Sequence, residues 1–396
     1  MADDPIVIAS YARTPIGSFQ GALSSLKATE LGARAVHEAV KRAGVEGDAV
    51  DQIFMGCVLP AGLGQAPARQ AALGAGLPGS VAATTVNKVC GSGLQAAILA
   101  SGMLATGAAD IVVAGGMESM SNAPYLLAKH RSGARIGHDR IADSLYLDGL
   151  EDAYDEGRLM GVFAEETAAA HQVTRADQDA FALESLTRAR QAQDNGAFER
   201  EIVPVLVKGR NGDSVVQYDE QPKRADPGRI PRLKPAFGAN GTITAANASS
   251  ISDGAAALVL TRASVARERH LPQLARVAAH AVHAQAPADF ATAPAPAIRK
   301  ALVRAGWDPE EVDLYEINEA FAVVALLAMR DLGIPREKLN VNGGACALGH
   351  PIGASGARVM ATLLAAMEER GAQRGVASLC IGGGEAVAMA VERLGG

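Results

Sequence analysis

Two stretches of this sequence, AVHEAVKRAGVEGDAVD (35–51) and AIRKALVRAGWDPEEVD (297–313), align with each other without a gap. Each has the apolar spacing of an amphipathic helix and an Ala-Gly pair at which that helix would end. A short turn follows in both, and a Val-Asp pair then leads into an apolar segment with the character of a strand. An internal repeat of this kind indicates that the chain contains two copies of one helix–strand unit.

The repeat continues along the chain with small gaps. CGSG (90–93) corresponds to GASG (353–356), and each motif opens a predicted helix. IVVAGGMES (111–119) corresponds to ASLCIGGGEA (377–386), and each is a predicted buried strand that runs into glycines. Strands that alternate with helices predict an α/β protein whose mixed or parallel sheets are covered on both faces.

The repeat divides the chain into two halves and an insertion. We expect residues 1–120 and 251–273 to form the N-terminal half, and residues 274–396 to form the C-terminal half. Residues 121–250 have no counterpart in the second copy, and we call them the insertion. We expect the insertion to form a lid that binds ligand, because long insertions in compact folds are often functional. The alternative is that the insertion is a surface segment without a function.

One helix is clear within the insertion, from about Arg175 to Asn195. Thr174 is placed to cap its N-terminus, and Asp177 three residues later completes a weak capping box. Gly196 follows the last helical residue, and glycine at this place is a common helix stop.

The composition excludes several classes of protein. The chain has 396 residues and a formal net charge of -6, whereas nucleic-acid binding usually needs a basic face. Its longest apolar run, residues 320–329, is far shorter than the ~20 residues that span a bilayer. The N-terminal stretch MADDPIVIAS lacks the basic region of a signal peptide. We therefore expect a cytoplasmic protein that binds neither nucleic acid nor membrane, with Cys57, Cys90, Cys346 and Cys380 as free thiols.

Cys90 follows a short apolar strand and precedes a predicted helix whose first turn is Gly-Ser-Gly. A thiol at this place lies near the positive end of the helix dipole, so we expect its pKa to lie below the usual ~8.5. The small neighbours leave room for a bulky electrophile. Cys90 is therefore a candidate nucleophile, although buried structural cysteines are also common.

Two further segments carry candidate chemistry. His350, in NGGACALGHPIGASG (342–356), is set in a glycine-rich loop, and a neutral imidazole is the usual base for activating a thiol. Because the helix start after His350 mirrors the one after Cys90, we expect these two side chains to meet between the halves. Cys380 ends a strand and precedes three glycines whose backbone N–H groups suit an oxyanion. By itself it is a second nucleophile, a base or core packing.

Two sequence features remain open or unsupported as sites. Asn318 and Glu319, in YEINEAFA (315–322), stand between a strand and a helix, where they cap the helix or face a site. His280 and His283 are three residues apart, but no cysteine or carboxylate cluster accompanies them. We therefore expect no metal site.

Together these segments resemble the thiolase family over essentially the whole chain. NKVCGSG around Cys90, NEAF around Asn318, GGACALGHPIGASG around His350 and CIGGG after Leu379 stand in the order and spacing of that family. The best match is its short-chain acetyl-CoA acetyltransferase subgroup. The resemblance implies duplicated βαβαβαββ halves in a five-layer α-β-α-β-α core, with the insertion as lid, and a homodimer or homotetramer.

The resemblance also implies an activity. Two molecules of acetyl-CoA condense to acetoacetyl-CoA and CoA through an acetyl group on Cys90, and these thioesters are substrates, so no cofactor is expected. By resemblance, His350 activates Cys90 and Cys380 removes the α-proton of the second acetyl-CoA. Asn318 holds a water in one oxyanion site, and the N–H groups of Cys90 and Gly382 form the other. A 3-ketoacyl-CoA thiolase of broader chain length, acting in the degradative direction, is the alternative.

Contacts to CoA are carried over from the family in the same way. Those expected along the pantetheine arm and acyl group are Met160, Phe237, Ser249 and Phe321. Lys223 and Arg224 are candidates for the nucleotide phosphates, and a solvated basic loop is the alternative for them.

Three positions depart from the family's pattern. Leu159 stands where the family often has His, which puts the polarity of the pocket in doubt. Cys346 replaces an aliphatic residue and is expected only to pack. Pro222 replaces the Tyr of potassium-activated relatives, so no potassium requirement is expected.

Two other kinds of protein are weighed against this interpretation. A ketoacyl synthase would use a nucleophilic cysteine but would lack Cys380 and the NEAF segment. A carrier of acyl-CoA with a degenerate site would have lost catalytic positions that are intact here.

Overall fold

The structure is a computed structural model that describes residues 4–209 and 212–394. The first three residues of the N-terminal stretch considered above therefore lie outside the described residues. Within the described ranges no helix is both long enough and apolar enough to cross a membrane.

The helices and strands alternate in both halves as the repeat predicts. The first copy contains β1 (Ile6–Arg13), β2 (Gly17–Ser18), α1 (Ala28–Ala43), β3 (Gln52–Gly56), α2 (Pro67–Gly74), β4 (Ala82–Val86), α3 (Ser92–Ala105), β5 (Ile111–Ser119), β10 (Ser252–Arg262) and α7 (Ala263–Glu268). The second contains β11 (Ala275–Ala284), α8 (Pro294–Ala305), β12 (Leu314–Ile317), α9 (Ala322–Leu332), α10 (Ala345–Leu348), α11 (Ser355–Arg370), β13 (Arg374–Ile381) and β14 (Glu385–Arg393).

Both copies of the repeat end their first helix in the same way. The helix α1 stops at Gly44 with φ 68°, and α8 stops at Gly306 with φ 72°. These values lie in the left-handed region, where glycine avoids the steric cost that a side chain adds. A one-turn 3-10 helix and a strand follow in each copy, so the repeat read from the sequence is confirmed.

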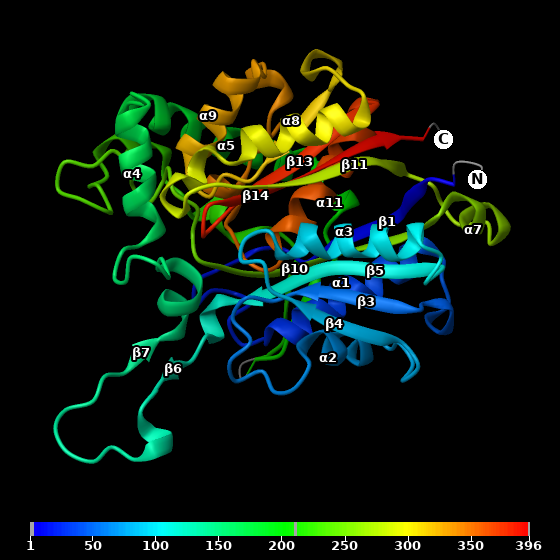
Figure 1. Ribbon diagram of the computed structural model, residues 1–396, viewed down its shortest axis with the longest axis horizontal. Coiled ribbons are helices and arrows are strands. Elements are labelled where there is room, and N and C mark those ends of the chain that lie inside the picture. Colours follow the sequence, from blue (N-terminus) through cyan, green and yellow to red (C-terminus); the bar gives the residue numbers. More distant parts are fainter. Residues whose placement is uncertain (1–3, 210–211, 395–396) are drawn as a thin grey trace.

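The strands of both halves form one sheet in the described part of the chain, in the order β12-β13-β14-β11-β1-β10-β5-β3-β4, with β2 beside β10. The halves join where Val7 and Ile8 of β1 pair with Arg276 and Ala275 of β11. Figure 1 shows the resulting layers, with α8 and α9 on one outside, α1 and α2 on the other, and α3 and α11 between the two parts of the sheet. The predicted five-layer α-β-α-β-α arrangement is confirmed.

The pairing of strands corrects one detail of the repeat. Val112 pairs with Gln52 on β3, and Gly375 pairs with Leu314 on β12. Gln52 and Leu314 are equivalent because each follows the Val-Asp of its copy, so Val112 corresponds to Gly375. The predicted match of 111–119 with 377–386 is therefore out of register, because it aligned glycines that occupy different positions on the two strands.

Helices α3 and α11 pack unusually closely in the central layer. A Cβ atom on Gly356 would lie 2.1 Å from the backbone nitrogen of Leu94, and one on Gly93 would lie 2.6 Å from that of Ala357. Side chains larger than hydrogen do not fit between backbones at these distances. The duplicated CGSG and GASG motifs thus bring the two helix starts into direct contact.

The insertion contributes β6 (Tyr125–Leu126), β7 (Ala142–Asp143), α4 (Met160–Ala170), α5 (Arg175–Asp194), β8 (Val205–Val207), β9 (Ser214–Val216) and α6 (Glu220–Arg224). The predicted cap of α5 is confirmed, since the Thr174 hydroxyl accepts from Asp177 N–H and the Asp177 carboxylate accepts from Thr174 N–H. Arg13 of β1 ties the insertion to the core through fully buried ion pairs with Glu201 at 2.8 Å and Asp219 at 2.7 Å.

Candidate active site

The loop that carries Cys90 is held in a strained conformation between β4 and α3. Val89 has φ 44°, which is rare for a β-branched residue. Its N–H donates to the Asn87 side chain at 3.0 Å, and its carbonyl accepts from the Ser92 hydroxyl at 2.6 Å. Strain of this kind persists only where neighbouring contacts enforce it, and it is concentrated at functional sites.

Burial controls the ionisation of Cys90. The thiol is half-buried and packs against apolar side chains that include Leu59 and Ile352. This burial raises the pKa of Cys90 to about 11, although the backbone N–H groups of Gly382 and Cys90 act to lower it. The expected pKa below the usual value is therefore wrong, because loss of hydration outweighs the end of the helix.

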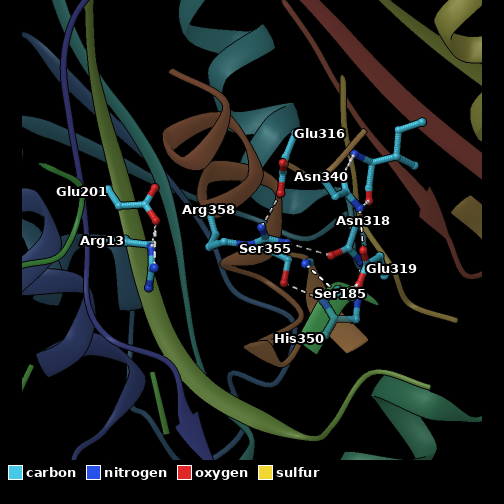
Figure 2. Close-up of polar contacts among 12 residues, drawn as sticks. Arg13, Ser185, Glu201, Glu316, Asn318, Glu319, Asn340, His350, Ser355 and Arg358 are labelled. Carbon is cyan, nitrogen blue, oxygen red and sulfur yellow. Dashed lines mark hydrogen bonds and ion pairs between the residues drawn. The ribbon is translucent and has the colours of Figure 1, made fainter. Parts of the chain in front are cut away.

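His350 is buried and held in one tautomer (Figure 2). Its Nδ1 lies 2.5 Å from the Ser355 hydroxyl oxygen, and that hydroxyl donates its single proton to the Pro351 carbonyl at 2.9 Å. The oxygen must therefore accept from Nδ1–H, which leaves a lone pair on Nε2. Burial, and then the charge of Arg358, lowers the pKa of His350 to about 3, so the resting imidazole is neutral.

The two polar residues of the NEAF segment have different surroundings. The Asn318 amide nitrogen lies 3.5 Å from His350 Nε2, so Asn318 faces the site. The Glu319 carboxylate accepts instead from Ser185 at 2.8 Å, from the Asn340 amide at 2.8 Å and from Cys346 N–H at 3.1 Å. Glu319 therefore holds neighbouring segments together, and α9 is capped by neither residue.

Cys380, at the end of β13, lies close to Cys90. Burial raises its pKa well above the usual value, and the charge of Cys90 raises it further. The segments that carry the two thiols are in contact, since a Cβ atom on Gly91 would lie 2.4 Å from the Ile381 side chain and one on Gly382 would lie 3.7 Å from that of Val89. This geometry brings the two thiols near each other, but it does not show which of them is the nucleophile and which is the base.

Most of the residues expected to contact the substrate gather around Cys380. Met160 and Phe237 pack against the apolar cluster that contains Cys380 and Phe321. The rings of Phe237 and Phe321 meet edge to face with centroids 6.1 Å apart. Ser249 is tied to this cluster by its N–H, which donates to the Ala320 carbonyl at 2.9 Å.

The two basic candidates lie further out, on α6. Lys223 and Arg224 are both exposed, and Lys223 lies over the ring of Tyr218 at 4.0 Å. Arg224 forms an ion pair with Glu220 at 2.7 Å and lines a cavity of about 570 Å³. This cavity also borders Ser250, next to Ser249, and the half-buried Cys346.

Glu118 is a buried residue of this region that the sequence analysis missed. Its carboxylate accepts from Val58 N–H at 2.9 Å, Leu59 N–H at 3.2 Å and Gly353 N–H at 2.9 Å. It thereby fixes the loop after His350 to the first half. Burial raises the pKa of Glu118 to about 7.

Ser355 and Arg358 were also missed, and for Ser355 the repeat contained the signal. Ser355 corresponds to Ser92, and each hydroxyl donates to a carbonyl of the preceding loop, Pro351 and Val89 respectively. Among the described residues, no three or more His, Cys, Asp or Glu side chains are grouped so that they could hold a metal ion.

Comparisons with known proteins agree with this geometry. Residues 6–264 match the family model described as "Thiolase, N-terminal domain", and residues 271–393 match "Thiolase, C-terminal domain". An acetyl-CoA acetyltransferase of Schizosaccharomyces pombe is 49% identical over 100% of both chains. Acetyl-CoA acetyltransferase 2 of Arabidopsis thaliana is 51% identical over 98% of this chain and 97% of its own. The crystal structure of a Bacillus anthracis acetyl-CoA acetyltransferase has a TM-score of 0.96 at 42% identity, covering 99% of both chains.

Proposed function

This chain belongs to the thiolase family, and we propose that it is an acetyl-CoA C-acetyltransferase, which condenses two acetyl-CoA molecules to acetoacetyl-CoA and CoA. The observation that carries the proposal is the contact between the Cys90 loop and the segment after Cys380, together with a neutral His350 whose lone pair lies on Nε2. Two-step acyl transfer needs a nucleophile to hold the acyl group and a separate base to make the carbon nucleophile. A carrier protein needs neither.

In the first half-reaction, Cys90 becomes acetylated. His350 Nε2 takes the proton of the Cys90 thiol, and the thiolate attacks the thioester carbonyl. The N–H groups of Cys90 and Gly382, which already favour charge on the Cys90 sulfur, stabilise the oxyanion. One such donor is typically worth ~10²–10³ in rate. The carbon–sulfur bond to CoA then breaks, and the Cys380 thiol protonates the leaving sulfur.

In the second half-reaction, Cys380 acts as base. Its thiolate removes an α-proton from a second acetyl-CoA, and the carbanion attacks the acetyl group on Cys90. Acetoacetyl-CoA leaves, and the His350 imidazolium returns its proton to Cys90. The raised pKa of Cys380 suits this step, because a weakly acidic carbon needs a strong base. Asn318 faces the side of His350 where the enolate oxygen would lie.

The substrate would lie between the insertion and the core. Met160, Phe237, Phe321 and Ser249 would contact the acyl and pantetheine groups, since they gather at Cys380. We assign Arg224 to the nucleotide phosphates because it is basic and lines a cavity that also borders Ser250, and Lys223 is an adjacent candidate. In this proposal the edge-to-face contact of Phe237 with Phe321 bounds the acyl group and favours short chains over the broader range of a degradative thiolase.

Location, cofactor use and assembly belong to the same proposal. All four cysteines are free, which suits a reducing, cytoplasmic compartment, and the chemistry above needs no cofactor. A homodimer or homotetramer is supported by β4, whose outer edge has no neighbouring strand within the described ranges. The excursion at residues 125–143 exposes Tyr125, Leu127, Ile136 and Ile141, and exposed apolar groups of this kind mark interfaces.

Two cysteine variants test the mechanism. On mixing with acetyl-CoA, the wild-type chain should release free CoA and gain an acetyl adduct by intact mass. Cys90→Ser should lose the adduct and most turnover, whereas Cys380→Ala should keep the adduct and fail to condense. An adduct that persists in Cys90→Ser would remove Cys90 as the nucleophile. Near wild-type condensation by Cys380→Ala would make Cys380 core packing.

A further inference from the structure

Arg358 is a charged residue at the centre of the molecule, and the mechanism above does not use it. It lies on α11 in the central layer, and its exposed fraction is 2%. One terminal nitrogen donates to Glu316 at 2.9 Å, and the other donates to the Asn318 amide oxygen at 3.2 Å. Figure 2 shows the guanidinium between these two side chains, with His350 beyond Asn318.

The donor of Arg358 decides how the Asn318 amide is oriented. A guanidinium has donors and no acceptor, so it can face only the oxygen of an amide. With its oxygen engaged, Asn318 presents its NH₂ group toward His350 Nε2, which carries the lone pair. Without Arg358, either orientation of the amide would be open, and one of them would place an oxygen lone pair against the imidazole.

Glu316 compensates the positive charge of Arg358, which would otherwise be buried without a partner. It lies on β12 two residues before Asn318, its exposed fraction is also 2%, and its carboxylate is the counter-ion of Arg358. Buried ion pairs contribute little net stability, and apolar pairs of similar volume often replace them without loss. Stability alone therefore gives no reason for a guanidinium aimed at a residue of the site.

We propose that Arg358 is a positioning residue, which fixes the Asn318 amide toward His350 and the enolate and is held in place by Glu316. The expected change in kcat rests on the proposed function. The expected change in the orientation of Asn318 rests only on the contacts of its side chain. The two are tested separately.

The kinetic test removes both charges together, because removing one would leave the other buried without a partner. The double variant Arg358→Met with Glu316→Leu should fold, with kcat for condensation reduced about 10²-fold, as expected for a misaligned catalytic group. KM should change far less, and the rate of Cys90 acetylation should not fall, because Asn318 acts on the enolate and loss of the Arg358 charge leaves His350 a stronger base. Arg358→Lys keeps the positive charge but lacks the planar pair of N–H donors that reaches Glu316 and Asn318 together. We expect its kcat to fall roughly tenfold. Thr362→Val, one turn further along α11, is the control and should change neither rate.

A crystal structure of the double variant provides a readout that does not depend on turnover. An Asn318 amide that is rotated or displaced from His350 supports the proposal, whatever reaction the chain catalyses. An amide that stays as in the wild-type protein, or a kcat within threefold of the wild-type value, overturns it. Failure of the wild-type chain to release CoA from acetyl-CoA would instead refute the proposed function.

Discussion

At the scale of single residues, the site combines a thiol that resists ionisation with a base that resists protonation. Burial raises the pKa of Cys90 to about 11 and lowers that of His350 to about 3. In the resting site the proton therefore stays on sulfur. Under the proposed mechanism we expect transfer to His350 to accompany attack on a thioester, which leaves the Cys90 thiol unreactive when no substrate is bound.

Alkylation of the resting protein tests this interpretation. Only the thiolate reacts. While the pH is below the pKa, the thiolate fraction increases about tenfold for each unit by which the pH is raised. The rate at which iodoacetamide labels Cys90 should therefore keep rising between pH 7 and 10. The label can be located on the Cys90 peptide by mass spectrometry, with Cys90→Ser as the blank. A rate that levels off near pH 7 would show a much lower pKa.

The same residues show what the sequence could and could not predict. Cys90, His350 and Cys380 stand in glycine-rich motifs, and these motifs contact one another in the structure, since Gly91 faces Ile381 and Gly93 faces Gly353. Arg358 stands in the helix segment SGARVMATLLAAMEER, where a lone arginine is typical of a solvated face. Only the packing of α11 between two parts of the sheet buries it. The pKa of Cys90 was missed for a related reason, since desolvation depends on residues distant in the chain.

At the scale of elements, the site depends on the close contact of α3 with α11. The two helix starts carry Cys90 and His350 on the loops before them, so the separation of the helices sets the separation of the loops. The repeat predicted that these starts would be equivalent. It could not predict their distance, which follows from glycines that face each other across the central layer.

A single methyl group should disturb this contact. In Gly356→Ala the new Cβ would lie 2.1 Å from Leu94 N, so the helices must separate. We expect a loss of ~1–3 kcal/mol or more in the free energy of unfolding, as for other overpacked cores, together with reduced turnover. Gly102→Ala on α3 is the matched control, because no atom lies within 4 Å of its Cβ position, and it should be neutral or stabilising. Urea denaturation of both variants gives the comparison, and equal stability would contradict the packing argument.

At the scale of the whole molecule, the two halves are similar units whose largest difference is in one connection. In the second copy, β13 and β14 are joined by the short glycine turn that carries Gly382. In the first copy, the equivalent strands β5 and β10 are joined by the entire insertion. The insertion returns to this glycine turn, where a Cβ atom on Gly382 would lie 3.6 Å from the Met160 sulfur.

The first and last described residues of the chain lie close together. Leu394 N–H donates to the Leu274 carbonyl, Leu274 N–H donates to the Ile8 carbonyl, and Leu394 packs against the cluster that contains Val7. Figure 1 shows the start of β1 and the end of β14 on one side of the molecule. Because these ends are adjacent, we expect the fold not to depend on which half comes first in the sequence. A circular permutant should tolerate the exchange of that order, as proteins with adjacent termini often do.

We expect a permuted chain that starts at the exposed His270, runs through a short Gly-Ser linker from 394 to 4, and ends at Arg269 to fold. Its condensation rate should lie within about threefold of the wild-type rate, because the opened loop lies between the halves and away from the site. A linear chain that carries the same linker at its C-terminus is the control. A permutant that folds only partly would show that the N-terminal half must be made first. Because the ends are adjacent, comparing the permuted and linear chains therefore measures whether the order of synthesis of the halves matters for folding.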